Sequence, residues 1–120
     1  LIDFHKSHGK IATITGVHPP ARFGELLTEG QEVKTFSEKP QTSYGYINGG
    51  FFVFNKNLLD FLEEKEECDL EYGVLEELAT KGELIMYEHS GFWQCMDNIR
   101  DMELLNKLWN SGNAPWKIWE

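Results

Sequence analysis

The chain has 120 residues, of which 41% are hydrophobic, 13% aromatic and 26% charged. This length suits one compact domain, because domains commonly contain about 100 to 150 residues, and the supply of large apolar side chains excludes disordered and collagen-like classes. Twenty acidic residues against eleven basic ones give a net charge of −9. Such a charge repels nucleic acid and anionic lipid, so we expect neither as a partner.

The apolar runs of the chain are short, and its cysteines are few. No run reaches the roughly 20 residues that a membrane-spanning helix needs, so we expect no membrane partner. Cys68 and Cys95 form neither a disulfide framework nor a zinc-site spacing, which favours a reducing cytoplasm. The chain opens at Leu1 within an apparent helix, without an initiator Met or a signal peptide. This opening predicts a piece cut from a longer protein.

The first half of the chain predicts a helix, a strand, a β-hairpin and a second long strand, over residues 2–8, 11–17, 24–37 and 46–54. Gly9 ends the helix, and the hairpin turn falls at residues 29–31. Pro40 ends the second hairpin strand. Because the second half of the 46–54 strand is continuously apolar, we expect both of its faces to be covered.

The second half predicts an amphipathic helix, a second helix, a strand and a C-terminal helix after Asp97, the first three over residues 57–67, 71–81 and 83–89. One side of the second helix is apolar, with Val74, Leu75, Leu78 and Ala79. A similar stripe runs along the C-terminal helix, with Ile99, Met102, Leu105 and Leu108. No linker or repeat interrupts the pattern. We therefore expect one domain over residues 1–120, with an α/β fold, a mixed sheet, a β-hairpin and flanking helices.

The sequence Glu38-Lys39-Pro40, at the end of the predicted hairpin, places a carboxylate beside an ammonium group. A carboxylate accepts hydrogen bonds from vicinal hydroxyls, and a lysine ammonium is a point charge suited to a phosphate, so the pair has the chemistry of a sugar-phosphate site. Adjacent residues on a regular strand point to opposite faces, and a shared ligand therefore requires a bend. The residues alone favour a simpler interpretation, an exposed charged pair before a proline.

The sequence Asn48-Gly49-Gly50 places two glycines inside an otherwise apolar strand. This choice is costly unless the backbone is approached closely or forms a bulge, and a ligand or a neighbouring element explains it equally. Asn48 either binds a sugar hydroxyl or caps the strand. Gly24 follows Arg22 and Phe23, and it either permits a close approach or only begins the hairpin.

Asp97 stands just before the C-terminal helix, so its simplest role is that of an N-cap. Its carboxylate also suits Mg²⁺, which takes one or two protein carboxylates and completes its shell with water and substrate phosphates. Both roles are compatible. The histidines and cysteines show no metal-ligand spacing, and no nucleophile elbow or phosphate-binding glycine loop is present. We therefore assign no catalytic residue to this chain.

Taken in order, five motifs resemble the C-terminal half of the sugar nucleotidyltransferases, and in particular their glucose-1-phosphate cytidylyltransferase branch. They span almost the whole chain: Pro-Ala-Arg-Phe-Gly at 20–24, Phe-Ser-Glu-Lys-Pro at 36–40, Ile-Asn-Gly-Gly-Phe-Phe-Val at 47–53, Gly-Phe-Trp-Gln-Cys-Met-Asp at 91–97 and Ala-Pro-Trp-Lys-Ile-Trp at 114–119. The resemblance implies a Rossmann-like nucleotidyltransferase fold. It also implies an enzyme that makes CDP-glucose and pyrophosphate from CTP and α-D-glucose 1-phosphate, for bacterial lipopolysaccharide O-antigen.

The same resemblance implies roles for six residues. Glu38 would hold sugar hydroxyls and Lys39 the sugar phosphate, Asp97 would hold Mg²⁺, and the glucosyl ring would contact Gly24, Asn48 and Gly49. The resemblance also implies that the partners are the small molecules glucose 1-phosphate and CTP and that the whole protein is a homo-oligomer. The roles of His89 and Arg100 stay open.

One departure from the family pattern concerns the nucleotide. The family's Gly-rich loop, which grips the nucleotide phosphates, has no match here, nor has its other metal-binding Asp. The fragment alone is therefore predicted to be inactive, and the choice among CTP, UTP and dTTP stays open. Two alternatives remain, a non-catalytic sugar-phosphate or sugar-nucleotide binding module and an assembly domain that buries the hairpin and the aromatic tail.

Overall fold

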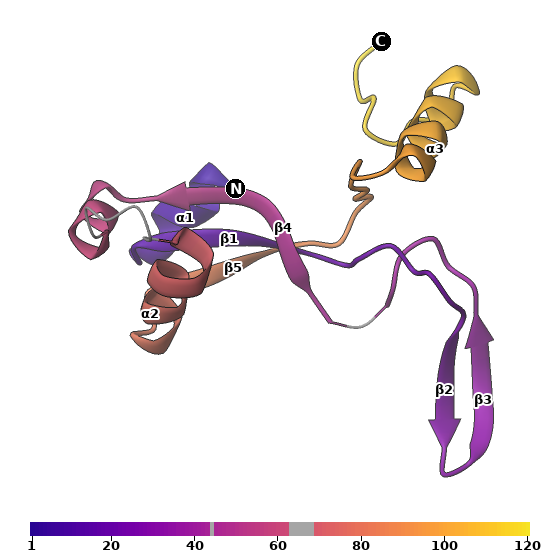
Figure 1. The fold of residues 1–120 in the computed structure, drawn as a ribbon, viewed down its shortest axis with the longest axis horizontal. Helices are drawn as coiled ribbons and strands as arrows, with labels where there is room; N and C mark the ends of the chain where they lie inside the picture. The colour runs from indigo at the N-terminus through magenta and orange to yellow at the C-terminus, as the bar shows by residue number, and fades with distance from the viewer. Residues whose placement is uncertain (44, 63–68) are drawn as a thin grey trace. The chain divides into compact units, whose positions relative to one another are not determined.

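The computed structural model of the chain describes residues 1–43, 45–62 and 69–120 (Figure 1). Contacts group the chain into two compact units, the first formed by 1–17 with 47–89 and the second by 18–46 with 90–120. The prediction of one domain over residues 1–120 stays a prediction. The acidic end of the predicted 57–67 helix, at residues 63–67, lies outside the described residues.

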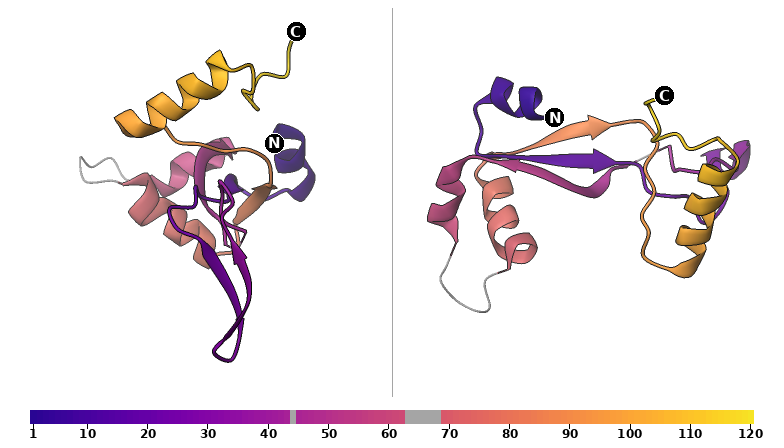
Figure 2. Two further views of the ribbon diagram at one scale, coloured as in Figure 1. Left: turned by 90° about the vertical axis from the view of Figure 1, so that its right-hand side faces the viewer. Right: turned by 90° about the horizontal axis from the view of Figure 1, so that it is seen from above.

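A three-stranded mixed sheet forms the centre of the first unit. Its strand order is β4 (Ile47–Phe54), β1 (Ala12–Val17) and β5 (Leu84–His89). Strand β1 pairs antiparallel with β4 and parallel with β5, and Figure 2 shows the three strands side by side. The predicted strands at 11–17, 46–54 and 83–89 are confirmed, and so is the mixed sheet.

The core of the first unit lies where helix α2 (Leu75–Thr80) and its flanking turns meet the sheet (Figure 1). Ala12 and Leu78 are fully buried there, together with Leu58 and Val74. The predicted 71–81 helix is confirmed, although its first turn, Leu70–Val74, is π-helical. Of the four residues on its apolar side, Val74, Leu75 and Leu78 are buried and Ala79 is exposed.

Two further predictions for the first unit are wrong in part. The helix predicted from residue 57 is a 3₁₀ helix over Lys56–Phe61, with Leu58 as its buried residue. The predicted cover on both faces of β4 is absent from one face, where Phe51 is 71% exposed. Phe52 and Phe54 alternate with Phe51, and their rings stack 5.4 Å apart. Side chains alternate along a strand, so the continuous apolar run conceals one solvated face.

Helix α1 (Ile2–His8), which ends at Gly9 as predicted, is attached to the sheet by a partly buried hydrogen-bond network. Thr13 Oγ1 lies 2.7 Å from His5 Nδ1 and 2.6 Å from His8 Nε2. The Lys10 amide donates to His8 Nδ1, and Asn55 Oδ1 accepts from His5 Nε2. The Thr13 hydroxyl thus links both rings of the helix to strand β1.

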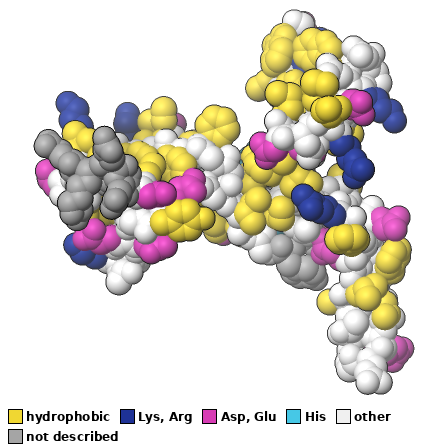
Figure 3. Space-filling view, viewed as in Figure 1, with side chains coloured by type: hydrophobic (Ala, Val, Ile, Leu, Met, Phe, Trp, Pro, Cys, Tyr) yellow, Lys and Arg dark blue, Asp and Glu magenta, His cyan; other side chains and the backbone are white. Residues whose placement is uncertain are grey.

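The second unit contains the predicted hairpin and the predicted C-terminal helix. Strands β2 (Glu25–Glu29) and β3 (Glu32–Ser37) pair antiparallel, with Gly30 in the turn at a φ of 61°. Helix α3 (Ile99–Asn110) contains no buried residue, and its predicted apolar stripe is open at Ile99, which is 70% exposed. Figure 3 shows hydrophobic side chains gathered on the surface over α3. Within the described ranges, no helix is long and apolar enough to cross a membrane.

Candidate functional site

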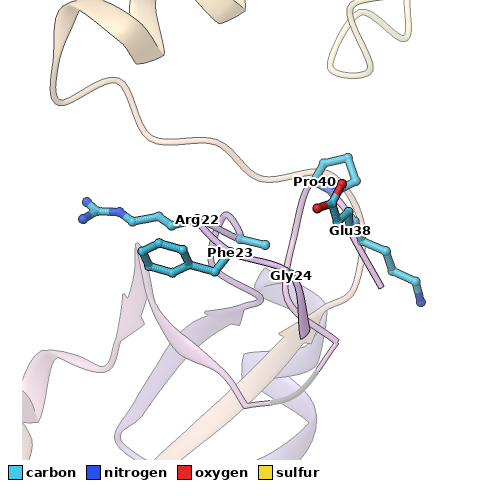
Figure 4. Close-up of a pocket in the computed structure, with 7 residues that line it drawn as sticks. Arg22, Phe23, Gly24, Glu38 and Pro40 are labelled. Atoms are coloured by element: carbon cyan, nitrogen blue, oxygen red, sulfur yellow. The ribbon is translucent and has the colours of Figure 1, made fainter. Parts of the chain in front are cut away.

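An open pocket of about 550 Å³ lies at the base of the hairpin, within the second unit (Figure 4). Two short segments line it, residues 21–24 before β2 and residues 38–40 after β3. These are the Arg-Phe-Gly and Glu-Lys-Pro motifs of the sequence. The structure thus brings Gly24, Glu38 and Lys39 together, although they are separated by the whole hairpin along the chain.

The register of the two strands explains how the pocket forms. The hairpin ladder ends at the pair Glu25 and Ser37, and pairing resumes at the bridge between Pro20 and Gln41. Four residues on one side, 21–24, therefore face three on the other, 38–40. Unequal segments cannot form a regular ladder, so the two chains separate, as they do around a bulge. The pocket is this opening, closed at both ends by paired backbone.

Gly24 lies where the pocket meets the hairpin, close to the neighbouring strand. A Cβ atom at this position would lie 2.6 Å from Cε2 and 2.7 Å from Cζ of the Phe36 ring. Of the two alternatives for Gly24, the structure shows a close approach, and the approaching group is the Phe36 ring of the next strand.

Glu38 and Lys39 both lie beyond the last residue of β3, so the alternation of a regular strand does not separate them. The Lys39 ammonium donates to Ser43 Oγ at 3.5 Å, a long and exposed contact. Figure 4 shows the Glu38 carboxylate near Pro40, and the Arg22 side chain extends away from it. With Arg22 and Lys39 against one carboxylate, the lining is positive in a chain of net charge −9. This balance favours an anion that also carries hydroxyl groups.

Sequence reasoning assigned no role to two side chains of this lining, Arg22 and Phe23. Phe23 is 84% exposed, an unusual state for a large apolar side chain beside a pocket. Their position in the sequence could have identified them, because Arg22 and Phe23 directly precede Gly24, which the sequence analysis named as a candidate site residue.

Asn48 and Gly49 lie on β4 in the first unit, and their local geometry is that of a bulge. The register of β1 against β4 shifts between Ile14 and Gly16, and Gly50 has a φ of 93°. Asn48 Oδ1 accepts the Gly50 amide at 2.8 Å. A Cβ atom on Gly49 would lie 2.7 Å from Val17 Cγ1. The glycines are thus explained by the sheet itself, and the role of Asn48 and Gly49 in sugar binding stays a prediction.

The N-cap of α3 is Asn98, whose side chain accepts the Asp101 amide at 2.8 Å, so the N-cap role predicted for Asp97 is wrong by one residue. The Asp97 amide donates to Asp101 Oδ2 at 3.2 Å, and the Cys95 thiol approaches the same oxygen at 3.7 Å. Burial raises the pKa of the Cys95 thiol above its ordinary value, and the charges of Asp101 and Asp97 raise it further. Asp97 is not among the residues that line the pocket.

The fit of Mg²⁺ to this segment depends on a single carboxylate. No group of three or more His, Cys, Asp or Glu side chains in the described part of the chain has a metal-binding arrangement. Both Asp101 oxygens accept hydrogen bonds, Oδ1 from Gln94 and Oδ2 from the Asp97 amide. Asp97 alone fits Mg²⁺ only in the mode in which water and substrate phosphates supply the other ligands.

Comparison with known sequences gives the chain its relatives. A family model described as nucleotidyl transferase matches residues 1–109. Glucose-1-phosphate cytidylyltransferases of Salmonella typhi and Salmonella typhimurium are each 49% identical over 119 residues, which is 99% of this chain and 46% of theirs. The mannose-1-phosphate guanylyltransferase catalytic subunit beta of Drosophila melanogaster is 36% identical over 105 residues, or 84% of this chain and 28% of that protein. The chain thus spans about half the length of the cytidylyltransferases.

A solved structure has the same fold. It is a Bacillus anthracis protein described as a glucose-1-phosphate thymidylyltransferase, crystallised with sucrose, and it superimposes with a TM-score of 0.56 at 15% identity. The match covers 99% of this chain and 50% of that one. The predicted α/β nucleotidyltransferase architecture is confirmed by this match, and the predicted resemblance by the sequence relatives. The chain belongs to the nucleotidyl transferase family.

Proposed function

We propose that this chain is the sugar-phosphate-binding half of an enzyme that makes CDP-glucose and pyrophosphate from CTP and α-D-glucose 1-phosphate. The relatives that match 99% of the chain at 49% identity are named for that sugar phosphate and that nucleotidyl group. The observation that carries the proposal is the pocket in which Gly24, Glu38 and Lys39 meet.

The reaction assigns a separate task to each pocket side chain. A phosphate oxygen of glucose 1-phosphate attacks the α-phosphorus of CTP in line, the bond to the β-phosphate oxygen breaks, and pyrophosphate leaves. No covalent enzyme intermediate is needed, so the protein positions the reactants and neutralises charge. Lys39 would hold the sugar phosphate and Glu38 would accept hydrogen bonds from sugar hydroxyls. Gly24, Asn48 and Gly49 would contact the glucosyl ring.

Asp97 would hold the Mg²⁺ ion, through one carboxylate and with phosphate oxygens completing the shell. Bound Mg²⁺ would neutralise phosphate charge during transfer. The Asp97 amide donates to Asp101 Oδ2, so a second carboxylate lies beside this residue. A cation would meet favourable charge there even before the substrate phosphates arrive.

Nucleotide selection belongs to a part of the protein that this chain does not supply. No Gly-rich phosphate loop occurs in the sequence. We therefore propose that the isolated 120 residues form no CDP-glucose and that the full-length protein does. Supplying CTP, UTP and dTTP in parallel to the full-length protein identifies the base. Product formation by the isolated chain would refute the division of labour.

The decisive experiment compares binding of glucose 1-phosphate and glucose to the full-length protein and its Lys39→Ala variant. Loss of one charge-assisted contact of about 1.5 to 3 kcal/mol should weaken glucose 1-phosphate binding about 10-fold to 150-fold, with little effect on glucose. Lys34→Ala is the matched control, because Lys34 pairs with Glu29 and Glu32 on the exposed hairpin. Equal loss for both sugars would contradict a phosphate role for Lys39.

The same measurements separate the remaining possibilities. Tight binding of glucose 1-phosphate without product, in the full-length protein with any nucleotide, would identify a binding module. Sedimentation before and after deletion of residues 113–120 tests the proposed homo-oligomer and the assembly role of the aromatic tail. A cytoplasmic enzyme of lipopolysaccharide O-antigen synthesis is the setting that this proposal implies.

A further inference from the structure

The side chain of Gln41 connects three points of the backbone in the second unit. Its Nε2 donates to the carbonyl oxygen of His18 at 2.9 Å and to that of Gly91 at 3.4 Å. Its Oε1 accepts the amide of Trp93 at 3.3 Å. One amide side chain thus joins the chain that enters the hairpin, the chain that leaves it and a segment about fifty residues further along.

The chemistry of these contacts fixes the orientation of the Gln41 amide. An amide N–H such as that of Trp93 can only donate, so it must face Oε1, and two carbonyl oxygens must face the NH₂ group. The contacts to Gly91 and Trp93 imitate the paired hydrogen bonds between neighbouring β-strands. Gln41 therefore holds the 91–93 segment as a partner strand would.

Gln41 also lies at a functionally important place in the ribbon. It follows Pro40, the last pocket residue, and its bridge to Pro20 closes one end of the pocket. Gln41 also contacts Trp93, and Asp97 lies four residues after Trp93 in the sequence. The Gln41 amide is thus the connection between the pocket lining and the segment that carries Asp97.

Packing alone does not place that segment. The described residues of the second unit include no buried side chain, so the stretch from Gly91 to Asp97 has no core to fix it. The Phe92 ring lies 5.8 Å from the Trp116 ring, a contact with the aromatic tail. Where burial is small, specific hydrogen bonds set the geometry, and the Gln41 bonds join this segment to the hairpin base.

We propose that Gln41 is a positioning residue that couples the pocket at Gly24, Glu38 and Lys39 to the placement of Asp97. The inference rests on the proposed function, since it assigns Gln41 a part in bringing sugar phosphate and cation together. It gives Gln41 no contact with substrate. Its side chain holds the segment at residues 91–93 in register with the base of the hairpin.

The test uses the full-length protein with Gln41→Leu, which removes all three hydrogen bonds at similar size, and Gln41→Glu, which sets a carboxylate oxygen against two carbonyls. Gln31→Leu, at the hairpin turn, is the control. Both Gln41 variants should raise the Mg²⁺ concentration for half-maximal rate by about 10-fold or more and lower kcat. Binding of glucose 1-phosphate measured without metal should change less than threefold.

Two further readouts distinguish positioning from a general structural role. Hydrogen exchange at the Trp93 amide should accelerate at least tenfold in Gln41→Leu, with unchanged exchange in the first unit. Gln41→Leu combined with Asp97→Asn should be no slower than Asp97→Asn alone, because residues that act through one another are not additive. If Gln41→Leu does not fold, Gln41→Glu carries the same measurements.

The possible negative results overturn different proposals. A full-length wild type that neither binds glucose 1-phosphate nor transfers a nucleotidyl group overturns the proposed function and the role of Gln41 with it. An active wild type with unchanged Trp93 exchange and Mg²⁺ dependence in Gln41→Leu overturns only the role of Gln41. Metal-free sugar-phosphate binding that falls as much as kcat also overturns it.

Discussion

The two units of this chain differ in how their structure is held. Every buried residue in the described ranges belongs to the first unit, including Ala12, Val17 and Leu78, whereas the second unit, which carries the pocket, has none. The first unit is organised by burial of apolar area, the larger stabilising term in folding. The second is organised by a hairpin ladder, the Gln41 amide and surface aromatic contacts. Stability and binding are therefore expected to respond to different substitutions.

The largest difference between the two units is expected when the same substitution, leucine to alanine, is made in each and the loss of unfolding free energy is compared. Leu78→Ala opens a cavity beside Ala12 and Val74 and should cost about 2 to 5 kcal/mol of unfolding free energy. Leu104→Ala, on α3 at 42% exposed, should cost less than about 1 kcal/mol. Denaturant unfolding of the two variants of the full-length protein gives both values. Equal losses would show that α3 is as well packed as the core.

A smaller contrast is expected between two glycines. An alanine at Gly49 would meet Val17, which is 1% exposed, and the Thr15 carbonyl at 3.1 Å, and neither can yield easily. Overpacking of this kind costs about 1 to 3 kcal/mol.

Gly24→Ala meets the ring of Phe36, which is 62% exposed and free to turn toward solvent, and touches Glu38 Cγ at an ordinary contact distance of 3.5 Å. Its cost in thermal unfolding should stay below that of Gly49→Ala, while binding of glucose 1-phosphate weakens because the displaced ring borders the pocket. A reversed order of stabilities would contradict the conclusion that the first unit is the more tightly packed of the two.

The smallest effect concerns the Cys95 thiol. Because its pKa is raised, first by burial and then by Asp101 and Asp97, the thiol stays protonated to higher pH than an ordinary cysteine. Alkylation at pH 8 in a Cys68→Ser background should therefore be slow and should accelerate as pH rises. Asp101→Asn removes one negative charge, so the rise in rate should move to lower pH. Asp3→Asn, on α1 in the other unit, is the control and should leave the profile unchanged.

Local patterns in the sequence predicted the elements well, because each depends on neighbouring residues. A β-rich run predicted β1 and alternation predicted β5, and glycines at positive φ end α1 and form the hairpin turn. What the sequence could not provide was register. The pairing of Glu25 with Ser37 and of Pro20 with Gln41 creates the pocket, and it depends on long-range partners.

The burial of individual side chains is the second property that the hydrophobic patterns of the sequence did not predict correctly. The apolar run of β4 and the stripe of α3 both look like core in the sequence, yet Phe51 and Ile99 are largely exposed. Hydrophobic periodicity identifies the face of an element, but it does not say whether anything covers that face. The sequence predicted more accurately that Glu38 and Lys39 share a site, because they lie on the same short segment and line the same pocket.

The unequal segments around the pocket separate its geometry from the length of the arm beyond it. Because the ladder closes at Glu25 and Ser37 on one side and at Pro20 and Gln41 on the other, removing one matched pair of residues further along the ribbon shortens the arm without altering the opening. Removing a single residue from 21–24 equalises the segments and lets the ladder zip shut. The length of this hairpin and the geometry of the pocket at its base are thus set by separate residue pairs.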